Sequence, residues 1–582
     1  MEKESIFDSP LVKSEVAKYL SNNDLAQCAL VSKKWSAWFL PALWRSIKFG
    51  QLSFGQLSTI SSEGLKRHQG HIQSLQGYQF NSAAQPYVWS YPNLTSLEFG
   101  PGFGRHGRRV DLATLKMVAG SPHLEHLKIS LNLDHVDVYQ ELRRVLQSLT
   151  RLKSLELHLI EFIEPVVIQD ILEICSRVKF LSVFLQSATY FMPGDEGAQL
   201  KLATEAMKRM QDTQVQHLEF QATDGSLELS ILPLFLKKCP MLESLSLPSL
   251  CQEQTMEQVV EIIKERTCPK LKHWSHGRVT YSGMSEDLFL ETFRATKSGT
   301  GEYDSDGDWM EGGLKTIAVG YPVALDERVI RTITEYHGTT LTTMNTPGFT
   351  MDLPSLTLLL SGLPALKSLA ATVTLPNAST HDPDLELTKK TSWACTGLKY
   401  LDVTCNTTGT FKVPGGKRWD ASAEKTCTDY LFSQIGSLTQ LEELILRTGM
   451  FDPFILKNGY LMPLSGLSNL KTLRLPRQYN IRMGVKEAEW MAENWTSLVY
   501  VAIEVVSRAL VSDEKSREAF EATLKEKRPS VEIGPSQPYS HMLFGGGFVN
   551  NRLGGYNNGF GGWGVQNGFV PFPWIRRSMN IK

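Results

Sequence analysis

The first residues whose type and spacing could bind a metal ion are three histidines. His126, His217 and His273 each stand at the same place in a recurring Leu-x-x-Leu-x-Leu pattern, so their side chains would share one column. Imidazole is a common zinc ligand, but zinc needs its ligands within about 2 Å of one point. The repeats that carry these histidines are not consecutive, so more than one strand spacing would separate the rings. We therefore expect no metal site and no cofactor, and we expect these histidines to face solvent or a partner.

The cysteines offer no better case for chemistry. All eight are scattered without a Cys-x-x-Cys pair, which argues against a zinc ribbon or a redox motif. Cys239 and Cys268 each precede a proline just before an expected strand, where a small buried residue and a helix stop are the simpler roles. The sequence also lacks a Gly-x-Ser-x-Gly motif, a phosphate-binding loop and a His-Glu-x-x-His motif. It therefore predicts a protein that is not an enzyme.

The Leu-x-x-Leu-x-Leu pattern organises most of the 582 residues and would position these side chains. Where the pattern is regular, its leading residues stand 28, 26, 27 or 29 residues apart, which leaves room for a strand and a helix. Ile72 opens the series, Leu271 and Leu341 begin weaker copies, and clear copies begin at Leu94, Leu124, Leu152, Val178, Val215, Leu242, Leu314, Leu366, Leu398, Leu441, Leu470 and Leu498. This resembles the leucine-rich repeat, in which alternate leucines of a short strand point inward. We expect an α/β solenoid of roughly 14–16 repeats over residues 72–533, with parallel strands on the concave face and helices on the convex face.

Helical segments are visible between the expected strands, because apolar residues recur there at steps of three and four. They span residues 139–149, 167–175, 200–210, 256–266 and 328–336. A charged helix over 513–527 and a strand over 531–533 would close the array with a polar cap. Longer gaps near 184–200, 280–313 and 404–427 mark insertions, which in repeat proteins map to loops on a functional rim. The second insertion begins like a calcium loop at Glu302, but Gly313 stands where such a loop needs its last glutamate, so we expect no calcium there.

The x positions of the repeat point out of the concave face, which is a rigid surface suited to binding another protein. Aromatic side chains supply a large contact area at low entropy, so we expect those in these columns to act as anchors. The candidate substrate-binding residues are Phe180, Phe184, His217, Tyr400, Arg447, Arg474 and Tyr500. The alternative for the aromatic residues is packing beneath a neighbouring loop.

Residues 10–49 break the repeat and are predicted to form three helical pieces. The polar run from Ser21 to Asp24 separates the first two, and Pro41 marks the second break. Apolar residues recur at helical spacing in both of the longer pieces, so each presents one apolar stripe. A segment of this size buries too little surface to be stable alone, and it must therefore pack against a neighbour.

The stretch from Pro10 to Ile47 resembles the F-box, most clearly at Asp24-Leu25, at Leu30-Val31-Ser32-Lys33-Lys34-Trp35, and at Pro41 with Leu43-Trp44. The resemblance implies a three-helix module that docks on the Skp-type linker subunit of a cullin-RING ubiquitin ligase. The residues it implies for docking are Pro10, Leu11, Val12, Val16, Leu20, Leu25, Cys28, Val31, Trp35, Leu43 and Trp44. The chain departs from the family at Ser9, where a leucine usually precedes the proline, and at Lys13, which replaces an apolar residue. Alternatively, the stripe of the second piece is the core of a capping helix for the repeats.

Composition limits the classes of partner. With 60 basic and 61 acidic residues, the formal net charge of −1 gives no global field toward nucleic acid or an anionic membrane. The N-terminus is polar and no run of 18 apolar residues occurs, so we expect neither a signal peptide nor a membrane helix. The chain is then cytoplasmic, nuclear or both, and not secreted. Residues 534–582, rich in Gly, Asn and aromatics without a period, are expected to be a disordered tail.

These features predict four parts: an F-box-like module at 1–50, a linker or cap at 51–71, the solenoid at 72–533 and the tail at 534–582. The predicted function is a substrate-recognition adaptor of an SCF-type ubiquitin ligase, whose repeats hold a protein substrate near the transfer machinery. The alternative is a leucine-rich-repeat scaffold, or a GTPase-regulating protein, with no ligase role. A third hypothesis, binding of single-stranded RNA through the tail, lacks the basic groove that such proteins need.

Overall fold

The structure is a computed structural model that describes residues 9–49, 62–77, 90–99, 108–133, 135–160, 165–186, 196–222, 231–247, 253–276, 285–303, 305, 307–319, 325–375, 391–407, 421–448, 456, 461–478, 483–505 and 511–534. The predicted tail lies outside these residues except for Gly534. Parts of the insertions near 184–200 and 404–427 also lie outside them.

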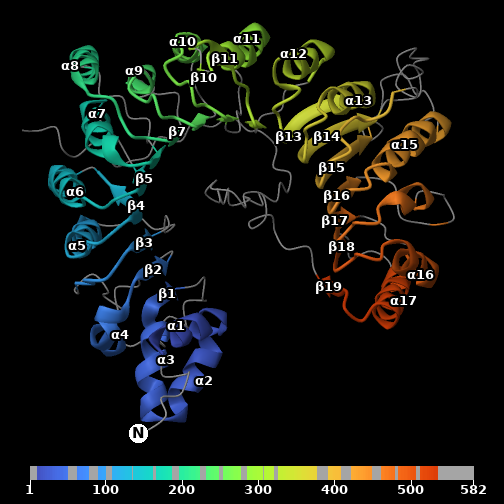
Figure 1. Cartoon of the computed structure of the whole chain (residues 1–582), viewed down its shortest axis with the longest axis horizontal. Coiled ribbons are helices and arrows are strands. Elements are labelled where there is room, and N and C mark those ends of the chain that lie inside the picture. The colour runs from blue at the N-terminus through green and yellow to red at the C-terminus, as the bar shows by residue number, and fades with distance from the viewer. Residues whose placement is uncertain are drawn as a thin grey trace, which may run out of the picture.

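One long parallel sheet runs through the described residues, and its strands line the inner side of an arch (Figure 1). It has 17 strands, and each pairs with the next strand along the chain except where β9 pairs with β12. The strands are β1 Ser46–Phe49, β2 Ser74–Gly77, β3 Ser96–Phe99, β4 His126–Asn132, β5 Ser154–Ile160, β6 Phe180–Gln186, β7 His217–Ala222, β8 Ser244–Leu247, β9 His273–His276, β12 Thr316–Val319, β13 Thr343–Asp352, β14 Ser368–Leu375, β15 Tyr400–Thr407, β16 Glu443–Thr448, β17 Thr472–Gln478, β18 Tyr500–Val505 and β19 Glu532–Gly534. This confirms the predicted α/β solenoid with parallel strands on its concave face.

Helices cover the outer side of the arch, beyond the three that precede the sheet (Figure 1). The helices are α1 Pro10–Tyr19, α2 Asn22–Val31, α3 Lys33–Arg45, α4 Ser62–His68, α5 Arg108–Ala119, α6 Val136–Ser148, α7 Pro165–Ile174, α8 Glu196–Arg209, α9 Leu232–Leu236, α10 Glu253–Lys264, α11 Glu286–Ser298, α12 Glu327–His337, α13 Leu353–Gly362, α15 Ala421–Gly436, α16 Val485–Asn494 and α17 Val511–Lys527. Single 3-10 turns occur at Gln69–His71, Cys175–Arg177 and Met462–Gly466. The five predicted internal helices correspond to α6, α7, α8, α10 and α12, with ends within four residues of the prediction. None of the helices in the described ranges is both long and apolar enough to cross a membrane.

The core is a continuous ladder of leucines between the sheet and the helices. In neighbouring strands the second leucine of each repeat stands in register, as Leu127, Leu155, Leu181 and Leu218 do, and each is at most 2% exposed. The weaker repeats are real coils, because Trp274 and Met344 occupy the same register position and are equally buried. Since each coil contacts mainly its neighbours, the ladder replaces the single core of a globular domain.

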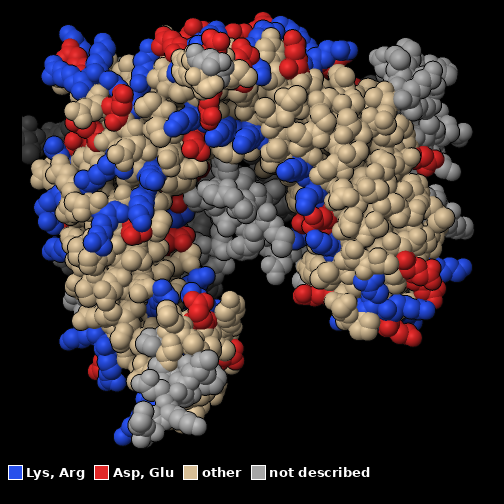
Figure 2. All heavy atoms as spheres, in the orientation of Figure 1, with Lys and Arg blue, Asp and Glu red and all other residues tan. Residues whose placement is uncertain are grey.

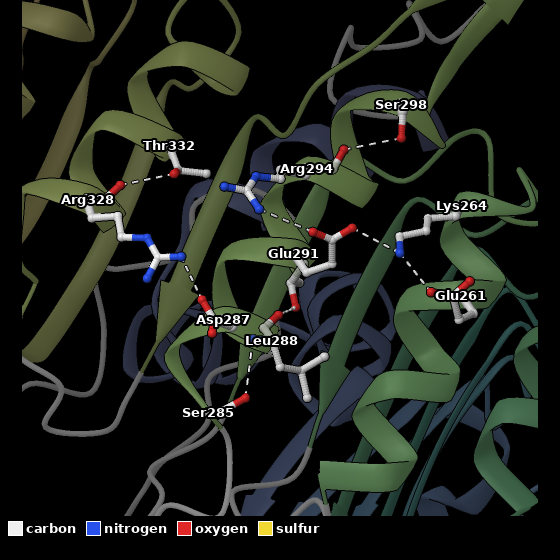
Figure 3. A network of polar contacts seen from close by, with 11 residues as sticks. Glu261, Lys264, Ser285, Asp287, Leu288, Glu291, Arg294, Ser298, Arg328 and Thr332 are labelled. Carbon is white, nitrogen blue, oxygen red and sulfur yellow. Dashed lines mark hydrogen bonds and ion pairs between the residues drawn. The ribbon is translucent and has the colours of Figure 1, made fainter.

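The convex side near the top of the arch carries a network of charged side chains across three helices (Figure 3). Lys264 of α10 bonds to Glu261 at 2.7 Å and reaches Glu291 of α11 at 2.9 Å. Arg328 of α12 pairs with Asp287 of α11 at 2.6 Å. These pairs are exposed, so each contributes less than about 1 kcal/mol, but together they fix α10, α11 and α12 side by side.

The insertion near 280–313 forms an antiparallel hairpin between α11 and the next strand of the sheet. Its strands β10 Gly301–Tyr303 and β11 Trp309–Glu311 pair with each other. Gly307 at the turn has a φ of 88°, a conformation that residues with a Cβ rarely adopt. Arg266, which follows α10, lies 4.5 Å from the centre of the Trp309 ring, and this contact ties the hairpin to the coil before it.

Two expectations about the N-terminal segment need correction. Pro41 does not separate two helices, since α3 runs through it from Lys33 to Arg45. The break between the second and third helices falls instead at Ser32. The backbone of Ser32 is extended, and its hydroxyl accepts a hydrogen bond from the Trp35 N–H, which caps the start of the third helix. The sheet also starts earlier than residue 72, because β1 pairs with β2 from Ser46 onward.

Candidate functional site

The three helices before the sheet, residues 9–45, form a small unit that we call the head. Ser21 caps α2 by accepting from the Asp24 N–H, and the Asp24 carboxylate accepts from the Ser21 N–H in return. Among the described residues of the head, Leu25 and Phe39 are the only buried ones, at 4% and 6% exposed. The head is therefore closed by very little core of its own.

The outside of the head carries large apolar side chains that the described chain leaves wholly or partly exposed. Leu11 is 78% exposed, Val31 is 65% exposed, and both Val16 and Trp35 are 38% exposed. Four more of the predicted docking residues are partly buried, namely Val12, Leu20, Cys28 and Leu43, and Pro10 begins α1. Tyr19 and Leu30, at 87% and 80%, were missing from the prediction although both are more exposed than Leu11. The sequence feature that could have identified them is an apolar residue in the last turn of a short helix, where no following turn covers the side chain.

Leu25 and Trp44 were predicted to contact a partner, but the structure uses them internally. Leu25 fills the interior of the head. Trp44 packs against the solenoid core and stacks on His68 with ring centroids 4.5 Å apart. Trp44, Ile47 and Phe49 stand at the spacing of Leu-x-x-Leu-x-Leu, and Ile47 is in register with Leu75. The head thus ends in a repeat that the sequence pattern did not reveal. This repeat joins the head rigidly to the sheet.

An aromatic cluster on β5, β6 and β7 contains three of the predicted substrate-binding residues, Phe180, Phe184 and His217, together with His158, which was not predicted. The two phenylalanines alternate with buried residues of β6, so they lie on the concave side. The rings of His158 and Phe184 are 5.2 Å apart, and those of Phe180 and His217 are 6.1 Å apart. All four side chains are partly exposed, and burial lowers the pKa of His217, which favours its neutral form.

A charged ladder borders the aromatic cluster. Glu156 of β5 pairs with Lys128 of β4 and lies 2.9 Å from His158 Nε2. Burial would raise the pKa of Glu156, but the hydrogen bond to His158 and the charge of Lys128 hold it below its usual value. The carboxylate stays ionised and fixes the ring of His158 beside Phe184.

The other predicted residues, Tyr400, Arg447, Arg474 and Tyr500, form an ionic cluster on β15 to β18. Asp402 and Glu443, which were not predicted, complete this cluster. Arg447 donates to Asp402 at 2.7 Å and to Thr404 at 3.1 Å. Arg474 pairs with Glu443 at 3.1 Å and lies 5.7 Å from the centre of the Tyr500 ring. Burial raises the pKa of Asp402 even though Arg447 opposes the shift.

The sheet holds the two clusters apart rather than bringing them together. Six strand spacings separate β7 from β15, which is roughly 29 Å along the sheet at ~4.8 Å per strand. The outward positions between them are mostly small, such as Ser246, Ser275, Ala318 and Ala370. A partner that uses both clusters must therefore reach across at least these six strand spacings.

The histidines of the shared column stand on separate strands, and every described cysteine except Cys28 is buried. His217 and His273 are separated by β8, and no group of possible metal ligands occurs among the described residues. Burial raises the pKa of the Cys175 and Cys239 thiols to about 12, so both stay protonated.

One position before each strand has a shared role. The Cys268 thiol reaches the Leu236 carbonyl at 3.7 Å and the Trp495 indole donates to the Leu464 carbonyl at 3.1 Å, each in the preceding coil. His337 does the same toward the Phe293 carbonyl through Nε2 at 3.0 Å. Its Nδ1 accepts from the Leu314 N–H at 3.2 Å, so the ring is neutral with its proton on Nε2. Each of these side chains therefore ties its own coil to the coil before it.

Comparison with known proteins gives likeness in fold only. No protein-family model and no curated protein matches the sequence. Among solved structures, an internalin from Listeria monocytogenes is 12% identical, with a TM-score of 0.27 over 80% of this chain and 88% of that one. The leucine-rich-repeat-containing protein LegL7 from Legionella pneumophila is 12% identical, with a TM-score of 0.29 over 57% of this chain and 95% of that one. A structure of the yeast Rad7 and Elc1 complex is 11% identical, with a TM-score of 0.35 over 91% of this chain and 98% of that chain.

Proposed function

We propose that this protein is the substrate-recognition adaptor of an SCF-type ubiquitin ligase. In this proposal the head is an F-box that docks on the Skp-type linker subunit, and the concave face of the solenoid holds a protein substrate. The chain performs no chemistry itself, and the assembled cullin-RING ligase transfers ubiquitin to the substrate that the chain holds.

The observation that carries the proposal is the exposed apolar surface of the head. Six large hydrophobic side chains, each 38% to 87% exposed, lie within 25 residues: Leu11, Val16, Tyr19, Leu30, Val31 and Trp35. A soluble chain rarely leaves such a surface open unless a partner covers it. The surface also lies on the segment whose sequence resembles the F-box.

The rigid join supports the same proposal. Because β1 continues from α3 directly into the sheet, a partner on the head is held at a fixed angle to the concave face. Arg45 Nε donates to Gln73 at 2.7 Å and strengthens this join. An adaptor that works by proximity needs such rigidity, because a loose link would dilute the effective concentration of the substrate.

The docking test uses the full chain and exposed residues only. We expect the double variant Leu30→Glu with Val31→Glu to fold normally and to lose co-purification with a Skp-type subunit, with affinity at least about 100-fold weaker. The variant Leu25→Asp is unsuitable, because it would place a charge inside the head and unfold it.

The matched control carries the same change on exposed apolar residues of the convex helices, Val136→Glu with Leu202→Glu, at 70% and 60% exposed. It should bind the linker subunit like the unaltered chain. Undiminished binding by the Leu30 and Val31 variant would refute the docking assignment.

A further comparison separates the adaptor from a scaffold without a ligase role. A chain that begins at Leu43 keeps Trp44 and β1 and therefore keeps the solenoid intact. With proteasome activity blocked, this truncated chain should still capture the protein substrates of the full chain, but those substrates should carry no added ubiquitin. If ubiquitin transfer to them continued, the scaffold hypothesis would be preferred.

A further inference from the structure

A second surface lies outside the two concave clusters, along the edge of the sheet where the strands start. The residue before each strand donates its backbone N–H to the equivalent carbonyl of the previous coil. Lys153 donates to Glu125 at 2.8 Å, Lys179 to Lys153 at 2.9 Å, and Gln216 to Lys179 at 2.8 Å. The side chains of these residues therefore form a row with a spacing of ~4.8 Å.

Basic side chains gather around an open hollow of about 400 Å³ on this edge, which we call the basic hollow. Arg151, Lys153, Arg177 and Lys179 line it. Glu125 is the only carboxylate among its lining residues, and Lys153 already bonds to it at 2.7 Å. The hollow therefore keeps a clear excess of positive charge on a chain whose net charge is −1.

Hydrogen bonds within the protein fix part of the positive charge of the basic hollow in position. The Arg177 guanidinium donates to the carbonyls of Leu146 and Leu149, which fixes its position beside the exposed Arg151 and Lys179. The pKa of Glu125 is lowered, first by its hydrogen bond from Lys153 and further by nearby charges that include Arg151. Figure 2 shows basic side chains over the limb of the arch that follows the head and along the inner margin of the crown.

The basic hollow adjoins the aromatic cluster, because both are built on the coils of β5, β6 and β7. Lys179 directly precedes Phe180, and Gln214 of the hollow stands three residues before His217. From Lys179 to Phe184 the distance along the strand is about 16 Å at ~3.3 Å per residue. An extended segment with carboxylates in the hollow would thus place a side chain five or six residues away on the aromatic rings.

We propose that the basic hollow and the aromatic cluster together bind an extended acidic segment of a partner protein, with an apolar residue five or six positions from its carboxylates. The carboxylates meet Arg151 and Lys179, and the apolar side chain packs on Phe184. This surface is separate from the head, so the proposal does not depend on docking to a linker subunit.

The test measures binding of a fluorescent peptide to the full chain without any other protein. The peptide has four glutamates, then four glycines and one phenylalanine. We expect Arg151→Glu with Lys179→Glu to weaken its binding at least about tenfold, and we expect raised salt to weaken binding to the unaltered chain. Phe184→Ala should weaken binding of this peptide several-fold, but not binding of the same peptide with alanine in place of phenylalanine.

The control Lys201→Glu with Lys208→Glu changes the net charge equally on α8, where both lysines are exposed. It should keep the affinity within about twofold. Equal weakening by this control, or no measurable binding by the unaltered chain, overturns the proposal. Tighter binding of a single-stranded oligonucleotide of equal charge through Arg151 and Lys179 also overturns it, in favour of a nucleic-acid partner.

Discussion

The head and the solenoid treat apolar side chains in opposite ways. The head buries only Leu25 and Phe39 among its described residues and leaves six large hydrophobic side chains at its surface. The solenoid hides its leucines almost completely and turns polar and aromatic side chains toward its concave face. The solenoid thus buries its own apolar core, whereas the head would bury much more apolar surface by binding a neighbour. Tests of this difference compare matched residues in the two regions.

The largest expected effect separates two leucines. Leu155→Ala removes a fully buried ladder side chain, so we expect the free energy of unfolding to fall by about 2–5 kcal/mol. Leu30→Ala removes a side chain that is 80% exposed, so we expect a change below about 0.5 kcal/mol. Urea unfolding followed by circular dichroism measures both. A loss at Leu30 as large as that at Leu155 would show that the head is not open in solution.

This contrast also separates what the sequence predicted from what it did not. The repeat period and the helices followed from periodicity, because one leucine position per coil must be buried in every repeat. Trp44 and Ile47 escaped notice because a tryptophan replaces the leading leucine of their repeat, and the F-box resemblance assigned Trp44 to a partner. Helix periodicity alone could not tell whether Leu25 or Leu30 faces outward, since that depends on how α1 and α3 pack against α2.

The sequence predicted only part of the contacts that Tyr400, Arg447, Arg474 and Tyr500 make. The repeat placed these residues in neighbouring columns, but their partners Asp402 and Glu443 became visible only from the strand register. The basic hollow was missed for a similar reason, since Arg151 and Lys179 are 28 residues apart and meet only through the stacking of coils.

A second test asks whether polar groups of the solenoid carry stability that those at its edge do not. Arg447→Ala leaves the carboxylate of Asp402, which is 3% exposed, without its closest cation, so we expect a loss of about 2 kcal/mol. Adding Asp402→Asn should recover most of that loss. Lys153→Ala breaks an exposed pair and should cost less than about 0.5 kcal/mol by the same unfolding assay. Equal losses of unfolding free energy for both substitutions would show that the ionic cluster contributes no more to stability than the exposed pair at the edge.

Mild acid should weaken the solenoid and spare the head. Burial lowers the pKa of His337 and His276 to about 4 in the folded chain, against a usual value of 6.5. The unfolded chain therefore takes up protons first, and the free energy of unfolding falls as pH drops from 6.5 to 4. The head contains no histidine between residues 9 and 45. Thermal unfolding measured at several pH values, with His337→Gln to flatten the trend, checks this.

The smallest expected effect concerns the join. Arg45→Ala removes the exposed hydrogen bond to Gln73, so we expect a loss of no more than about 1 kcal/mol. The change should appear locally, as faster hydrogen exchange of the backbone amides in β1, without a shift in the core of the solenoid. Unchanged exchange in β1 would mean that the stacking of Trp44 on His68 is sufficient to hold the join.

The parallel sheet has one further consequence, for self-association. An open sheet has two edge strands with unpaired backbone groups, and such edges tend to recruit another chain. Among the described residues the edges are β1 and β19, which have four and three residues, whereas β4, β5 and β6 have seven. Exposed Lys48 and Glu532 stand on the two edge strands. Short and charged ends of this kind discourage copies of the arch from adding to one another end to end, which keeps a long sheet from growing into a fibre.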